Sequence, residues 1–145
     1  MSQSSASLLT KHNKAQLERL AYLQEYRKNI DDPYVTQTLS LLIEDAQEAL
    51  ARVAGRLRQL GEAPGLIPDQ TDNKLLNQSR ARRNLADQVQ FVRQGLSFQL
   101  DWYKTQTKQL LDDLETQAVL VALARQTELR LKQWDNDLAD YQPGR

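Results

Sequence analysis

Few residues of this chain are suited to acid–base, nucleophilic or metal chemistry. Of its 145 residues only His12 is a histidine, and none is a cysteine. Without cysteine, a disulfide framework, a Cys-based zinc site, an iron–sulfur cluster and a thiol nucleophile are all excluded. A Ser-His-Asp mechanism would have to use His12, and the sequence contains no Gly-rich phosphate-binding loop. The composition therefore argues against several common kinds of active site.

Carboxylates are the remaining candidates for chemistry, since oxygen ligands suit metal ions such as manganese. Two interpretations stay open for them. They can form a metal site of unusual composition, or they can be structural, either solvated or held in a polar layer that sets helix register. Glu48 and Arg52 favour the solvated interpretation on their segment, because they form a helical pair four residues apart. The carboxylates considered are Glu18 and Glu128, as weak metal-ligand candidates, with Glu44, Glu48 and Asp101.

The densest basic run contains Arg80, Arg82 and Arg83, which are weak candidates for contact with an anion. Such a run can meet the phosphates of a nucleic acid or of a lipid headgroup. However, the chain carries 19 basic and 19 acidic residues, and its formal net charge is zero. This balance argues against nucleic-acid binding and favours a solvated turn near the start of a helix.

Leu, Gln, Ala, Glu, Arg and Lys dominate the composition, which favours helices over strands. Apolar residues recur at steps of three and four, and they predict helices over residues 8–30, 33–60, 74–111 and 114–140. The first helix has the least regular stripe. The predicted core positions are Leu9, Leu17, Leu20, Leu23 or Gln24, Tyr26 and Ile30; Val35, Leu39, Leu42, Ala46, Ala49, Val53, Leu57 and Leu60; Leu85, Val89, Val92, Leu96, Gln99, Tyr103, Gln106 and Leu110; and Leu114, Ala118, Val121, Ala124, Glu128, Leu131, Trp134 or Asp135, and Leu138.

Gly, Pro and Asp residues mark the ends of these helices. Asp31 or Asp32 is expected to cap the helix that begins at Pro33, and Gly61 is expected to end it. The pairs at 31–32 and 112–113 predict two-residue turns, whereas residues 61–73 form a long connector, where Thr71 or Asp72 can cap the next helix. Short turns make antiparallel neighbours, so the sequence predicts an all-α antiparallel four-helix bundle built of two helical hairpins with a long crossover. One domain is expected over residues 8–141, with flexible ends at 1–7 and 142–145.

The two predicted hairpins are also similar to each other. Ile30-Asp31-Asp32 matches Leu111-Asp112-Asp113 at an offset of 81 residues, and the core stripes match at nearly the same offset. Together with the Leu-Gly-x-x-Pro ending at residues 60–64, this pattern resembles the ferritin-like superfamily, in particular its small bacterial ferritin-like and rubrerythrin-like members. The resemblance covers most of the chain and implies a four-helix bundle.

The resemblance also implies where a di-metal site would lie. Metal-binding members carry a Glu on the first and third helices and Glu-x-x-His on the second and fourth, which together hold two iron or manganese ions. This chain departs from that pattern at nearly every position, so the resemblance implies a scaffold without the usual metal site and without a cofactor. The corresponding residues are Glu18; Ala46 and Ala49; Gln99; and Glu128 and Leu131, or Thr127 and Arg130 if the register shifts by one.

Aromatic residues form a second apolar strip on the predicted third helix. Phe91, Phe98 and Trp102 lie beside the main stripe of that helix rather than on it. Two roles stay open for this strip: packing against another helix of the same bundle, or forming a dimer surface, where aromatic residues are favoured.

These patterns lead to an expected function and two alternatives. We expect a non-enzymatic helical bundle that acts as a structural or protein-interaction module. Its expected partner is a second copy of the chain, which would make a dimer, or another protein. The alternatives are a metal-dependent oxidase or storage protein, and an amphipathic binder of lipid, polymer or nucleic-acid surfaces. The sequence has no apolar run long enough to span a membrane and no leader-like start, so we expect a cytoplasmic protein.

Overall fold

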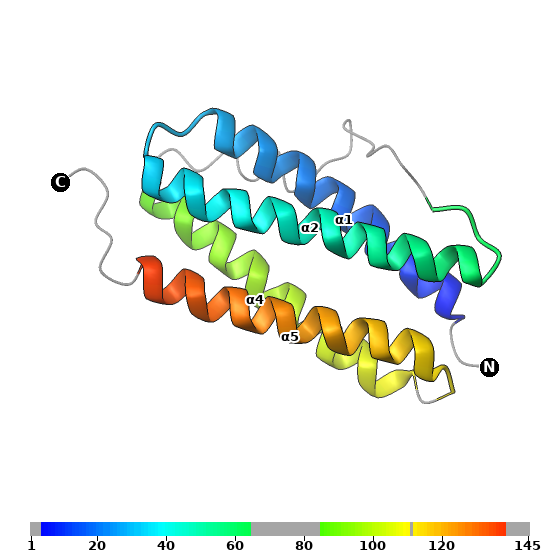
Figure 1. The fold of residues 1–145 in the computed structure, drawn as a ribbon. Coiled ribbons are helices and arrows are strands. Elements are labelled where there is room, and N and C mark those ends of the chain that lie inside the picture. Colours follow the sequence, from blue (N-terminus) through cyan, green and yellow to red (C-terminus); the bar gives the residue numbers. More distant parts are fainter. Residues whose placement is uncertain (1–3, 65–84, 111, 139–145) are drawn as a thin grey trace. The chain divides into compact units, whose positions relative to one another are not determined.

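The computed structural model describes residues 4–64, 85–110 and 112–138. Within these ranges the chain forms helices and no strands, as the composition predicts (Figure 1). The helices are α1 (Ser5–Lys28), α2 (Pro33–Gln59), α4 (Leu85–Gln109) and α5 (Leu114–Leu138). The chain divides into two compact units, one containing α1 and α2 and the other containing α4 and α5. The predicted connector beyond residue 64, its cap at Thr71 or Asp72, and the predicted helical residues 74–84 lie outside the described residues.

In the first unit, α1 and α2 pack side by side as a helical hairpin. The Ser4 hydroxyl accepts a hydrogen bond from the Ser7 amide, so α1 begins three residues earlier than its apolar stripe suggests. The Asp32 carboxylate accepts bonds from the amides of Tyr34 and Val35 and caps α2, with Pro33 in its first turn as predicted.

Gly61 ends this hairpin's second helix. Its φ of +83° lies in the left-handed region that favours glycine. The amide of Gly61 donates to the carbonyl of Arg58, and the amide of Glu62 donates to that of Leu57. These bonds satisfy carbonyl groups that the end of a helix leaves open, as expected for a glycine just past a helix C-terminus.

In the second unit, α4 and α5 form a second hairpin. The Asp113 carboxylate accepts bonds from both the amide and the hydroxyl of Thr116, at 3.1 and 2.6 Å, and so caps α5. Asp32 and Asp113 are 81 residues apart, the offset that relates the two halves of the sequence. The turn between α1 and α2 contains four residues, 29–32, rather than the predicted two, and α4 ends at Gln109, two residues earlier than predicted.

The core positions predicted on α2 and α4 are largely confirmed. On α2, every predicted residue from Val35 to Leu57 is buried. On α4, Val92, Leu96 and Tyr103 are buried, as is Leu110 just past its end, whereas Val89, Gln99 and Gln106 are of intermediate exposure and the side chain of Leu85 lies outside the description. These helices place their apolar residues on one face at steps of three and four, and that regularity identifies the buried face.

The predictions for α1 and α5 need correction. On α1, Leu17 and Leu20 are only partly buried, and polar residues lie between the buried residues Leu9 and Leu23. On α5, Trp134 and Leu138 are buried as predicted, but Leu114 is 69% exposed and Ala118 is exposed, so the predicted stripe is wrong over the first part of the helix. The buried residues of α5 are Thr116, Leu120, Leu123, Thr127, Trp134 and Leu138.

Candidate functional site

Few of the positions that the ferritin-like resemblance assigns to metal ligands have side chains that can bind a metal ion. Ala46 and Ala49 are buried on α2. On α5 the residue that is buried is Thr127, whose hydroxyl donates to the Leu123 carbonyl at 2.8 Å, while Glu128 beside it is of intermediate exposure. On α5, Thr127 is therefore more buried than its neighbour Glu128.

The other candidate carboxylates lie apart along the helices. Glu18 is of intermediate exposure on α1, and Asp101 is exposed on α4. Glu44 and Glu48 are exposed on α2, where Glu48 forms an ion pair with Arg52 at 3.0 Å. Over the described ranges, no group of three or more His, Cys, Asp or Glu side chains is arranged to hold a metal ion. The basic candidates Arg80, Arg82 and Arg83 lie outside the described residues.

A polar contact within α4 involves the predicted core residues Gln99 and Tyr103. The Gln99 amide donates to the Tyr103 hydroxyl at 3.1 Å, one turn further along the helix. Tyr103 is fully buried, and its ring also meets the Trp102 ring edge to face, with centroids 5.7 Å apart. Gln99 therefore satisfies a buried hydroxyl group.

The apolar pattern of the sequence did not predict a row of buried polar residues on α1. His12, Asn13, Gln16 and Arg19 are all buried, in line with Leu9 and Leu23. Burial lowers the pKa of His12 to about 4, and a hydrogen bond with Asn13 raises it in part. The imidazole is therefore neutral at physiological pH. The signal for this row was the spacing 9, 12, 16, 19, 23, which the apolar residues Leu17 and Leu20 obscured.

The surface of α4 carries the clearest exposed apolar feature. Phe98 lies near the middle of the helix with 65% of its surface exposed. Phe91, Gly95 and Trp102 lie on the same side of α4 at steps of four and three, and each is of intermediate exposure. We call Phe91, Gly95, Phe98 and Trp102 the α4 strip.

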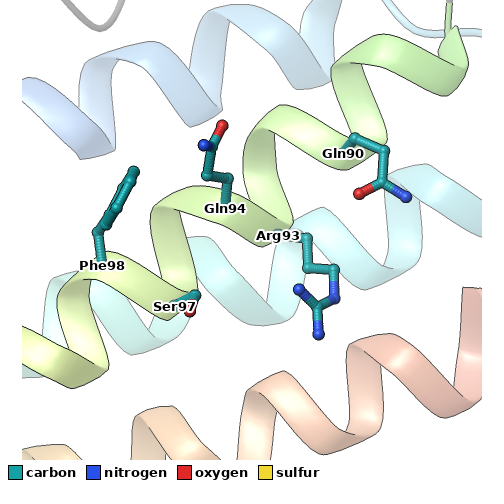
Figure 2. Close-up of a pocket in the computed structure, with 5 residues that line it drawn as sticks. All are labelled: Gln90, Arg93, Gln94, Ser97 and Phe98. Atoms are coloured by element: carbon teal, nitrogen blue, oxygen red, sulfur yellow. The ribbon is translucent and has the colours of Figure 1, made fainter.

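A shallow hollow lies beside the α4 strip, lined by residues of α4 alone (Figure 2). Phe98 forms one end of this hollow, and Gln90, Gln94 and Ser97 contribute uncharged polar groups to it. The only charged residue lining it, Arg93, points toward α5 (Figure 2). Aromatic residues are enriched at surfaces that bind protein, and charged residues are depleted at the centre of such surfaces.

Arg93 is tied to α5 by an ion pair with Asp135. Its Nε and one terminal nitrogen donate to the two carboxylate oxygens, at 2.6 and 3.0 Å. This hydrogen bonding, with the charge of Asp135, raises the pKa of Arg93. The pair is bidentate, so it fixes the guanidinium and neutralises the one cation that lines the hollow.

Comparison with known proteins adds no family to this description. No family model matches the chain, and no curated protein and no solved structure matches it. In addition, no helix in the described part of the chain combines the length and apolar character needed to cross a membrane.

Proposed function

We propose that this chain is a non-enzymatic helical module that acts by binding protein, with a second copy of itself as its first partner. The observation that carries the proposal is Phe98, a large aromatic side chain that is 65% exposed in the middle of a well-formed helix. Phe91 and Trp102 extend the apolar surface on either side of it. Aromatic residues at the centre of a patch are the typical anchors of protein interfaces.

The ferritin-like topology without a metal site is part of this proposal. Its support is the sequence resemblance, together with two hairpins whose second helices are each capped by an Asp at the same offset. Ala46 and Ala49, buried where the family places Glu and His, support the loss of the site. An Ala pair supplies no ligand, so the bundle centre would serve packing.

Light scattering on the purified full-length chain tests self-association. We expect the mass to rise from that of one chain toward that of two as concentration increases through the micromolar range. A mass of one chain up to hundreds of micromolar would overturn self-association.

Metal analysis of the same protein tests the absence of a metal site. We expect less than stoichiometric iron, manganese and zinc after dialysis against each ion. Stoichiometric metal that disappears in the Glu18→Gln, Glu128→Gln double variant would replace the proposal with the metal-dependent alternative. Sedimentation with anionic liposomes at low salt tests the surface-binding alternative, and cosedimentation would favour it.

A further inference from the structure

The α4 strip can pair with the same strip of a second copy when the two α4 helices run in opposite directions. Phe91 and Trp102 are its outer members, and Gly95 and Phe98 are its inner ones. We consider an antiparallel pair of α4 helices centred between residues 95 and 98. Each residue of the strip then lies opposite the partner residue whose number, added to its own, gives 193. Phe91 then lies opposite the partner's Trp102, and Phe98 lies opposite the partner's Gly95.

Gly95 gives this pairing a physical basis. A glycine has no Cβ, so it leaves a shallow depression on the helix surface and permits a close approach. Phe98, one turn away, is the most exposed member of the strip. A two-fold contact in which each Phe98 ring fills the depression at the partner's Gly95 is a knob-into-hole arrangement, made twice by symmetry.

A row of polar residues, three of them charged, flanks the strip on one side. Asp87, Gln94, Asp101 and Lys108 are spaced seven residues apart along α4, and all are exposed. Residues on this flank of an antiparallel seam meet at a sum of 195, two more than the residues within the seam. Antiparallel pairing in the stated register therefore brings Asp87 near the partner's Lys108 and Gln94 near the partner's Asp101. Parallel pairing would instead leave Asp87 and the partner's Lys108 about 30 Å apart along the helices. The charges of this row therefore favour the antiparallel arrangement.

We propose that two copies of this chain associate through α4 in an antiparallel, two-fold arrangement, with Phe98 of each copy on the partner's Gly95 and Asp87 of each copy paired with the partner's Lys108. This inference rests on the proposed self-association and specifies its surface and its register. The hollow beside the strip adds no uncompensated charge, because its Arg93 is paired with Asp135.

A charge exchange on the full-length chain tests the register. Lys108→Asp or Asp87→Lys creates two like-charge contacts per dimer, and we expect each to raise the dimer Kd about tenfold. The double variant restores both ion pairs with their charges exchanged. We expect its Kd to return to within about threefold of the parent value. Lys132→Asp, at an exposed position on α5, is the matched control and should leave the Kd unchanged. Additive weakening in the double variant would overturn the register.

Substitutions in the strip test the contact itself. We expect Phe98→Glu to raise the Kd roughly a hundredfold, whereas Leu129→Glu, at the 72% exposed position on α5, has no effect. Gly95→Ala is expected to weaken the dimer because its methyl group fills the depression, while it raises the helix propensity of α4. Circular dichroism checks that each variant folds, and Phe98→Ala provides a milder substitution if the glutamate variant does not.

Cross-linking gives an independent measure of direction. The chain has no cysteine, so introduced thiols are the only ones present. With a short bis-maleimide, the Gln94→Cys, Asp101→Cys double variant is expected to form covalent dimers, and each single variant is expected to form few. Efficient dimers from both single variants would indicate parallel pairing and overturn the inference. A dimer that none of these substitutions affects would overturn the α4 surface while leaving the proposed self-association in place, and a chain that is always monomeric would overturn both.

Discussion

His12 is a buried imidazole, and its protonation is therefore coupled to folding. Burial lowers its pKa from 6.5 to about 4, so at pH 7 it is neutral in both the folded and the unfolded chain. Between pH 6.5 and pH 4 the unfolded chain binds a proton that the folded chain does not, so the free energy of unfolding decreases as the pH falls. The full decrease is on the order of 3 kcal/mol, reached near pH 4.

Urea unfolding at pH 7, 5.5 and 4.5 measures this dependence. The His12→Gln variant removes the titrating group, and it controls for the carboxylates that titrate in the same range. We expect the parent protein to lose more stability than the variant between pH 7 and pH 4.5. Equal losses in the two proteins would contradict the coupling.

The Arg93–Asp135 pair is predicted to contribute little to stability despite its bidentate geometry. Both side chains are about two-fifths exposed, at 42% and 43%, so water screens their attraction. We expect a double-mutant cycle with Arg93→Ala and Asp135→Ala to give a coupling energy of about 0.2–1 kcal/mol, reduced further by 1 M salt. A coupling energy above about 2 kcal/mol would show that the pair is desolvated in solution.

At the scale of the helix, the two Asp caps allow a closely matched comparison. Asp32 and Asp113 accept bonds from amides in the first turn of α2 and α5, whereas each neighbouring Asp precedes the cap. We expect Asp32→Ala and Asp113→Ala each to lower the free energy of unfolding by about 1 kcal/mol. Asp31→Ala and Asp112→Ala serve as controls with the same change in charge, and chemical denaturation compares the four variants. A cap variant no less stable than its control would contradict the assigned capping roles.

The helix ends and the buried helix faces show how far the sequence could predict this structure. Caps and breakers depend on one or two residues, and so Asp32, Pro33 and Gly61 predicted helix ends that the structure confirms. The buried face of α5 was harder to predict because apolar residues surround the helix, and an equally regular stripe runs through Leu114. The structure instead buries Thr127, whose hydroxyl is satisfied by a carbonyl of its own helix.

The polar row of α1 was missed for a related reason. Hydrophobicity alone ranks Leu17 and Leu20 above His12 and Gln16, yet the buried face contains the polar pair. Polar groups can be buried when they form hydrogen bonds, and hydrogen bonding depends on three-dimensional context. For the candidate site, the sequence identified Phe91, Phe98 and Trp102, but it left their role open. Only the structure separates exposed Phe98 from its partly buried neighbours.

At the scale of the whole molecule, the proposed self-association couples stability to concentration. A folded dimer that unfolds to separate chains gains stability with protein concentration by mass action. We expect the Tm of the parent chain to rise between about 5 and 500 μM, and the Tm of Phe98→Glu to stay constant over that range. Differential scanning calorimetry measures both. A parent Tm independent of concentration would argue that the dimer does not stabilise the fold.

The four-residue turn between α1 and α2 has a consequence for how the molecule is made. This turn joins two helices that pack against each other, so the contacts within the first unit connect segments close together along the chain. Closing such short loops costs little chain entropy, and domains rich in local contacts fold within microseconds to milliseconds. Synthesis adds only about 5–20 residues each second. During translation the α1–α2 hairpin therefore has time to form before the ribosome has finished α4.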